Sequence, residues 1–252
     1  MKKNAFSTLG LITVLVTGAT NLQAEQTGRG VGTGIIYPAP NFATVLNPAA
    51  IVDSPNISLL GLYRFDPKTP FVSLTTSAGF WGAGISYREE GTDTNIIEGS
   101  LGLTSTFILL GGTFRKVNDQ EANADVAIMF DLGGLRLGAV LRDVDGGADR
   151  VDTGIAFKLA DNAYVEFNIK KGRPFNDKVY LGDAAVVLHA HDWTIGVGYD
   201  FWIDENKKVQ DGDIHAGVSL MLANNFYADV HYRLMNQEWQ AQDWSAGARL
   251  LF

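Results

Sequence analysis

The chain contains no cysteine, so it can form neither a disulfide framework nor a thiolate metal site. Positive charge is also scarce: 20 Lys and Arg stand against 28 Asp and Glu, without a basic cluster. Nucleic acid is therefore an unsuitable partner, because phosphate binding needs concentrated Lys and Arg. After residue 24 no stretch approaches the roughly 18 apolar residues of a membrane-spanning helix. These absences exclude a disulfide-stapled domain, a nucleic-acid binder and a helical membrane protein.

The first residues have the pattern of a secretory signal peptide. Lys2 and Lys3 form a basic start, a mainly apolar stretch runs from Ala5 to Val16, and Ala24 is a small residue suited to cleavage. The apolar stretch is shorter than the roughly 20 residues that a transmembrane helix requires. We therefore expect residues 1–24 to be a signal peptide that is removed on export.

What the chain does contain is the two-residue period of β-strands. Hydrophobic residues make up 46% of the chain, and 28 residues are glycine. In residues 226–234 the even positions are apolar or aromatic, and three of the odd positions carry Asp, His or Arg. Such strands suit a barrel with lipid outside and polar groups inside. A soluble β-sandwich could show the same alternation, but it would rarely supply so many consecutive hairpins.

About 14 segments of this kind follow one another from residue 57 to the end. We expect strands at roughly 57–66, 70–78, 80–90, 95–105, 107–117, 124–132, 135–144, 150–160, 162–171, 178–188, 192–203, 213–222, 225–235 and 243–252. Their lengths match the roughly 9 to 11 tilted residues that cross a bilayer. Short connections alternate with longer polar ones throughout, which places the short connections and both chain termini on the periplasmic side. The predicted fold is all-β, an antiparallel transmembrane β-barrel over residues 57–252 in the outer membrane.

The final strand carries a candidate assembly signal. Trp244, Leu250 and Phe252 lie in phase on its apolar face. This ending resembles the carboxy-terminal signal of outer-membrane proteins, whose terminal aromatic is read by the barrel-assembly machinery. The resemblance implies that machinery as a partner during biogenesis, with outer-membrane lipid and lipopolysaccharide around the finished barrel.

Residues 25–56 differ from the rest, because Gly and Pro are too dense there for a regular strand or helix. We expect this segment to be an amino-terminal hatch that plugs the barrel, since about 14 strands enclose more space than their own side chains fill. Asn47, Pro48 and Ala49 precede the first strand. We expect Asn47 to form hydrogen bonds and Pro48 to fix the turn into the strand.

A Gly-rich stretch followed by Asn-Pro-Ala resembles the FadL-type outer-membrane transporters, whose hatch plugs a barrel of about 14 strands. The resemblance implies transport of small hydrophobic or amphipathic molecules. The chain departs from the family at Ala50, where Gly is usual, and in lacking long apolar external loops. PorV-like secretion components and TraF-like proteins share the Asn-Pro-Ala feature.

Charged and histidine side chains on the later strands are expected to point into the lumen. The predicted network consists of Asp200, His215, Asp229, His231, Arg233 and Arg249. The favoured interpretation is a buried charge network that braces plug against wall, with each polar group paired. A hydrolase, with Ser219 or Ser245 as nucleophile, is a less favoured alternative. Inward residues of both signs in similar numbers predict weak charge selectivity and a narrow or closed water path.

No cofactor or metal is expected. The Asp-rich loop at 143–149 has carboxylates at a spacing used by calcium loops, but it lacks their order and the closing Glu, so we interpret it as a solvated turn. The leading hypothesis is a non-enzymatic FadL-like channel or transporter for small hydrophobic or amphipathic molecules. The alternatives are a structural or assembly component that docks partner proteins and, third, an outer-membrane hydrolase.

Overall fold

The structure is a computed structural model that describes residues 37, 38, 40–54, 57–65, 68–90, 94–118, 122–146, 150–171, 180–190, 192–203, 208–210, 214–234 and 241–252. The expected signal peptide and the first part of the expected hatch lie outside these residues. The strands are β1 Ile57–Phe65, β2 Lys68–Ser77, β3 Trp81–Glu90, β4 Thr94–Ser105, β5 Ile108–Val117, β6 Asn123–Asp131, β7 Leu135–Arg142, β8 Arg150–Ala160, β9 Ala163–Lys171, β10 Tyr180–His189, β11 Trp193–Ile203, β12 Val209–Gln210, β13 Ile214–Ala223, β14 Phe226–Leu234 and β15 Ala241–Leu251.

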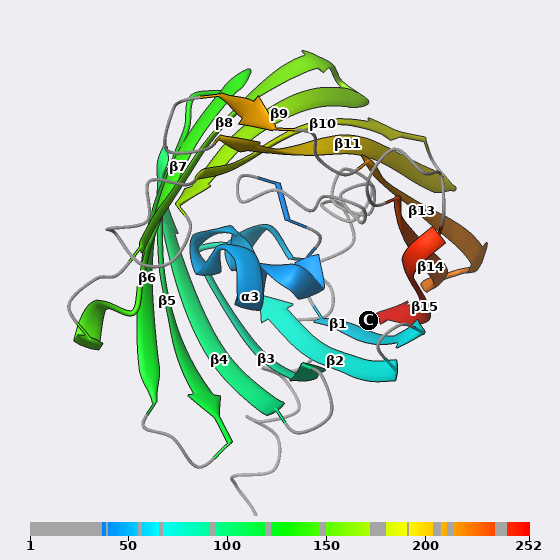
Figure 1. Cartoon of the computed structure of the whole chain (residues 1–252), viewed down its shortest axis with the longest axis horizontal. Coiled ribbons are helices and arrows are strands. Elements are labelled where there is room, and N and C mark those ends of the chain that lie inside the picture. Colours follow the sequence, from blue (N-terminus) through cyan, green and yellow to red (C-terminus); the bar gives the residue numbers. More distant parts are fainter. Residues whose placement is uncertain are drawn as a thin grey trace, which may run out of the picture.

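These strands close into a ring (Figure 1). Each strand pairs antiparallel with its neighbours in the chain, and β1 pairs with β15 in the register Ser58↔Leu251. The two-residue strand β12 adds only to the end of β11 and was not expected from the sequence. Without β12 the ring has 14 strands, as the 15-stranded order and the extra β10–β11 pairing require. The predicted closed antiparallel barrel of 14 strands is confirmed.

The two ends of the barrel differ in their connections. At one end, here called the turn end, the connections are 78–80, 106–107, 132–134, 161–162, 190–192 and 224–225. The opposite end, here called the loop end, carries the longer ones. The expectation of strict alternation is wrong at two places, because the loop-end connections 66–67 and 91–93 are no longer than those at the turn end.

The outer face of the ring is apolar. Exposed residues on it include Val72, Leu74, Ile85, Leu101, Leu110, Val126, Phe167, Val186, Val197, Leu220 and Val230. Aromatic rings lie near its loop end, where Phe65 and Trp244 stack with centroids 3.7 Å apart. An apolar band around the outside of a closed sheet is the surface that contact with lipid requires, and it would be unfavourable in water.

Among the described residues, no helix is both long enough and apolar enough to cross a membrane.

A short helical segment lies inside the ring (Figure 1). It consists of the 3-10 helix η1 Pro40–Phe42, the α-helix α3 Ala43–Leu46 and the 3-10 helix η2 Pro48–Asp53. We call residues 40–54 the inner segment. It packs mainly on the inner faces of β1 to β6. The expectation that Gly and Pro prevent regular helix is wrong for the described part, because residues 40–54 contain no Gly and each Pro stands at the first position of a 3-10 helix, where its missing N–H needs no partner.

The interior has three layers from the loop end to the turn end. Strand β6 shows them in sequence, because its inward residues are Asp125, then Ala127 and Met129, then Asp131. Charged side chains therefore lie at both ends, and apolar ones lie between. The apolar core includes Ala49, Ala50, Ile51 and Val52 of the inner segment with the wall residues Leu109, Ala127, Met129, Val140, Ala156, Tyr164 and Val187.

Candidate functional site

The inner segment is held to the wall by hydrogen bonds as well as by apolar packing. The Nδ2 group of Asn41 donates to the carbonyl oxygens of Ser58 and Ser73 at 3.0 and 3.1 Å. The hydroxyls of Ser100 and Thr113 both donate to the carbonyl of Thr44, each at 3.2 Å. The barrel wall thus satisfies backbone and side-chain groups that would otherwise be buried without partners.

The residues of the Asn-Pro-Ala motif form the start of η2. The backbone N–H of Ala49 donates to Asn47 Oδ1 at 3.0 Å, so Asn47 caps this helix, and Pro48 occupies its first position. Proline suits that position because it has no N–H that needs a partner. Asn47 and Ala49 are fully buried, facing the apolar core rather than solvent.

Three glycines on adjacent strands make room for η2. Gly82 is directly opposite Gly102, and Gly102 is directly opposite Gly111. A Cβ atom at Gly111 would lie 2.3 Å from the backbone N of Ala49 and from the backbone C of Pro48. At Gly82 it would lie 2.7 Å from the carbonyl of Ile51. Only glycine allows the backbone of the segment to approach the wall so closely.

At the loop end, arginines alternate with carboxylates on six neighbouring strands. The series is Arg88 on β3, Glu98 on β4, Arg115 on β5, Asp125 on β6, Arg142 on β7, and Asp152 and Arg150 on β8. We call it the charge ladder. Its successive contacts measure 2.5, 2.8, 2.5, 2.8, 3.0 and 3.0 Å. Each carboxylate bridges two arginines, so the ladder is a continuous ionic network across this part of the wall.

The ladder also contacts the inner segment. Arg142 donates to the carbonyls of Val45 and Leu46 at 3.0 and 2.6 Å. These carbonyls end α3 and have no partner within so short a helix. One buried guanidinium therefore joins Asp125, Asp152 and the end of α3.

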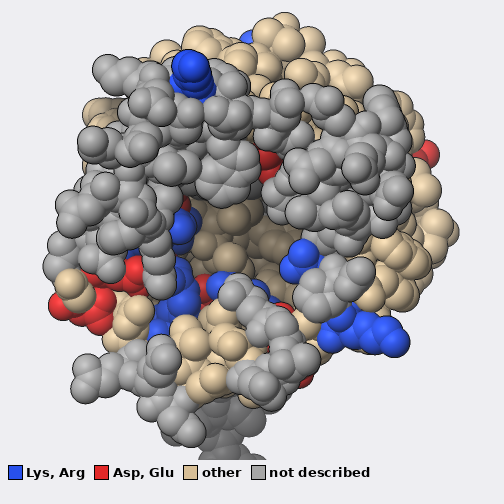
Figure 2. Space-filling view, in the orientation of Figure 1, with Lys and Arg blue, Asp and Glu red and all other residues tan. Residues whose placement is uncertain are grey.

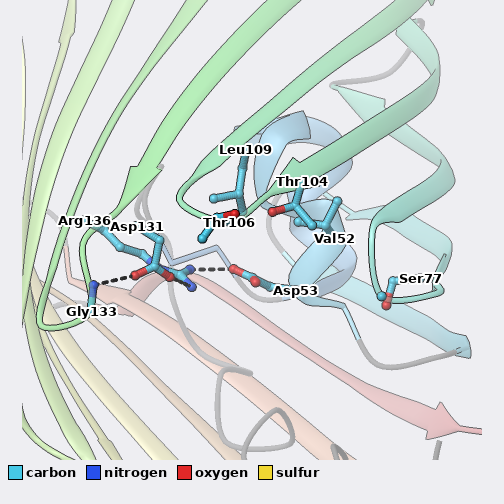
Figure 3. A pocket seen from close by; sticks show the side chains of 10 residues that line it. Val52, Asp53, Ser77, Thr104, Thr106, Leu109, Asp131, Gly133 and Arg136 are labelled. Carbon is cyan, nitrogen blue, oxygen red and sulfur yellow. Dashed lines mark hydrogen bonds and ion pairs between the residues drawn. The ribbon is translucent and has the colours of Figure 1, made fainter. Parts of the chain in front are cut away.

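A cavity lies at the turn end, between η2 and the turns of the wall (Figure 3). Its volume is about 440 Å³. Asp53 of the inner segment and Asp131 of β6 face the same buried side chain, Arg136 of β7, with the Asp53 Oδ2 to Arg136 Nη1 contact at 2.5 Å. Arg136 also lies 4.6 Å from the ring centre of Tyr37. Asp53, Arg136 and Asp131 thus form a second ionic cluster, which lines this cavity at the turn end.

Two groups of contacts are described within the network predicted on the later strands. His215 Nε2 lies 3.5 Å from Asp200 Oδ1, and Arg249 Nη2 lies 3.3 Å from Asp229 Oδ1 and 2.7 Å from Ser219 Oγ. The ring of His231 meets Phe42 edge-on at 5.9 Å. Arg233 is opposite His215 in register, but its side chain lies outside the described residues.

Among the side chains that the structure describes, the most extensive ionic network therefore lies on β3 to β8. The sequence predicted inward residues of both signs, but not this series. A sequence signal for this network exists, because neighbouring strands carry charged residues at the same level of the barrel. Glu98 is directly opposite Arg115, and Arg142 is directly opposite Arg150.

The described part of the Asp-rich loop is fixed by local contacts. The Oδ1 atom of Asp145 accepts the backbone N–H of Ala124 at 3.0 Å, and this hydrogen bond lowers the pKa of Asp145. Asp143 contacts Arg115 at 3.6 Å. Within the described residues, His, Asp and Glu do not gather into any group of three able to hold a metal ion.

Trp244, Leu250 and Phe252 all lie on the outer face of β15 and its end. The backbone N–H of Phe252 donates to the carbonyl of Ile57 at 2.9 Å, so the last residue extends the seam between the first and last strands. The exposed side chain of Phe252 therefore lies at this seam, where a protein that recognises the C-terminal residues would have access to it.

A closed antiparallel ring of 14 strands with an apolar outer band defines a transmembrane β-barrel. Neither the protein-family models nor the curated proteins give a match to the chain. Among solved structures, it is similar to the KdgM porin in complex with disordered oligogalacturonate, at 11% identity over 78% of this chain and 98% of that chain, with a TM-score of 0.48. A triple mutant of the Rhodopseudomonas blastica porin has 9% identity over the same shares, with a TM-score of 0.48.

Proposed function

We propose that the protein is an outer-membrane channel for small solutes whose lumen is closed at mid-height by the inner segment. One observation carries the proposal: the inner segment, which non-covalent contacts hold to the inner face of the wall, lies inside the ring between the charge ladder and the turn-end cavity. In this view residues 40–54 act as the hatch, and opening requires their displacement. The loop end faces the exterior and the turn end faces the periplasm.

The described interior favours polar over hydrophobic solutes. Its loop-end wall carries the guanidinium and carboxylate groups of the charge ladder, and Figure 2 shows a hollow with Lys and Arg side chains along part of its wall. An apolar solute would have to remove these groups from water without replacing their hydration. The FadL resemblance implies apolar substrates, whereas these groups support a channel of porin-like selectivity.

Replacing Gly111 by alanine is expected to raise the conductance of the barrel. The added Cβ would meet backbone atoms of Pro48 and Ala49 at 2.3 Å, so the hatch must move away from the wall. Overpacking of this kind costs about 1 to 3 kcal/mol, which shifts the population towards the displaced hatch. Single-channel recording in planar bilayers measures the open probability directly.

The matched control is Gly112→Ala, on the next residue of the same strand. Its Cβ would point to the outer face, and its nearest neighbour would be the carbonyl of Asp125 at 3.6 Å, an ordinary contact. Gly112→Ala should conduct like the unaltered protein. If Gly111→Ala folds but conducts no more than Gly112→Ala, the result would favour the alternative role of a closed structural component that docks partner proteins.

Removal of Phe252 is expected to reduce the amount of barrel that reaches the membrane. The proposal is that the assembly machinery reads Trp244, Leu250 and Phe252 on the outward face of the seam. Quantifying heat-modifiable, folded protein in isolated outer membranes gives the measurement, and Phe252→Tyr, which keeps an aromatic ring, is the control. Membrane levels of the truncated chain equal to those of the control would contradict this role.

A further inference from the structure

We infer that the inner segment opens from its turn end, where the contact between Asp53 and Arg136 is a latch, while α3 stays fixed at Arg142. The inference rests on the proposed channel function and names how its hatch is released. It predicts that η2 leaves the wall when the latch separates and that α3 does not follow.

The first step in the argument is that different arginines hold the two ends of the inner segment. At the loop end, Arg142 of β7 donates to the carbonyls of Val45 and Leu46, the last two residues of α3. At the turn end, Arg136 of the same strand contacts Asp53, the last residue of η2, at 2.5 Å. Because separate side chains make these contacts, one substitution can weaken either end without the other.

The second step is the access of water to the two contacts. The carboxylates beside Arg142 belong to Asp125 and Asp152, whose side chains are 1% and 0% exposed. The side chain of Asp53 is 23% exposed and lines the turn-end cavity. A partly exposed ion pair contributes little to stability, whereas removal of a partner from a buried network is strongly destabilising. The contact at the turn end is therefore the weaker of the two.

The third step is the space into which η2 can move. Val52 and Asp53 line the cavity of about 440 Å³, and Figure 3 shows Asp53 and Arg136 facing each other beside it. A close-packed interior resists movement, because a displaced group needs free volume to enter. The cavity supplies such volume at the end of η2 that carries the latch.

The fourth step is the position of a hinge. Asn47 joins α3 to η2, and its backbone is extended, with φ −155° and ψ 102°. Hinges are commonly a few residues at the end of an element, where a change in backbone angles is absorbed. Pro48–Asp53 is one continuous 3-10 helix, so it can move as a unit about Asn47.

Asp53→Asn is the substitution that weakens the latch. It removes the negative charge at the end of η2 and leaves Arg136 with Asp131, so the buried guanidinium keeps a carboxylate partner. Asp131→Asn is the matched control, because Asp131 contacts the same guanidinium but belongs to the wall strand β6. The control keeps a side-chain oxygen for the N–H of Gly133, which Asp131 accepts at 3.0 Å.

Thiol labelling measures the movement independently of conductance. The chain has no cysteine, so Ala50→Cys places one thiol in η2 and Thr44→Cys places one in α3. Ala50 and Thr44 are 4% and 1% exposed. A buried thiol reacts with a charged methanethiosulfonate when its surroundings open, so the labelling rate follows the open population. We expect Asp53→Asn to speed labelling of Ala50→Cys about fivefold, the upper end for a partly exposed ion pair.

The controls separate a latch from general loosening. Asp131→Asn should leave the labelling rate of Ala50→Cys unchanged, and Asp53→Asn should leave that of Thr44→Cys unchanged. Asp53→Glu, which keeps the charge, should label more slowly than Asp53→Asn. Val52→Cys, also in η2 and 6% exposed, provides the same test if Ala50→Cys does not fold.

An unchanged rate for Ala50→Cys in folded Asp53→Asn barrels would overturn the latch, as would an equal increase with Asp131→Asn. An equal increase at Thr44→Cys would also overturn it, because the whole segment would then leave the wall together. Faster labelling of η2 without conductance in any variant would refute the channel and leave the latch standing. Raised conductance of Gly111→Ala, with no effect of Asp53→Asn on labelling, would do the reverse.

Discussion

Replacing Arg142 by methionine is expected to lower the free energy of unfolding by about 3 to 5 kcal/mol, the usual cost of removing one partner from a buried ionic network. Arg142 is buried and holds Asp125 at 2.8 Å and Asp152 at 3.0 Å. Its loss also leaves the carbonyls of Val45 and Leu46 without this donor. Urea unfolding in detergent, followed by tryptophan fluorescence, measures the change.

Arg150→Met is the matched control, because Arg150 is directly opposite Arg142 and also contacts Asp152. Its guanidinium is partly exposed and makes no contact of this kind with α3. The loss of stability should therefore be clearly smaller. If both variants unfold at the same urea concentration, Arg142 does not act as the link between the wall and the inner segment.

Replacing Val197 by arginine is expected to cost about 2 to 4 kcal/mol, as for a charge on the lipid face near the bilayer midplane. Val197 lies near the middle of β11, and half of its side chain is exposed on the outer face. Reversible unfolding from lipid vesicles gives the free energy directly. The same substitution on a soluble surface would be tolerated, so the measurement tests membrane embedding as well as side-chain direction.

Leu222→Arg supplies the control for depth. Leu222 is also exposed on the outer face, but it lies near the end of β13, beside the turn at 224–225. A charge near the interface reaches water and headgroups, and its cost falls to roughly 0 to 1 kcal/mol. Equal costs at Val197 and Leu222 would contradict a membrane boundary at the turn end.

Much of the fold could be predicted from the chain alone because a lipid-facing strand must alternate at every second residue. The alternation at 226–234 fixes which side chains of β14 face outward, and the observed exposure of Val230 and burial of Asp229 confirm it. Regular spacing of such segments gave 14 strands. The β1–β2 connection was predicted too long because alternation defines faces more sharply than it defines strand ends.

The three layers of the interior were less visible in the sequence. Inward positions were expected to be polar, but Met129 and Val140 are apolar and pack on Ile51 and its neighbours in the core. Each such position is a single residue among alternating ones, and its meaning depends on what lies opposite across the lumen. A strand pattern contains no information about a segment that folds back from elsewhere in the chain.

The sequence by itself determined the strand faces and the ring of 14, because both depend on a regular spacing of residues along the chain. Only the tertiary structure decided the row of Gly82, Gly102 and Gly111 and the charge ladder, because these depend on the heights at which separate strands pair. The bond from Arg142 to Leu46 spans 96 residues of chain. Such a contact exists only once the barrel has closed around the inner segment.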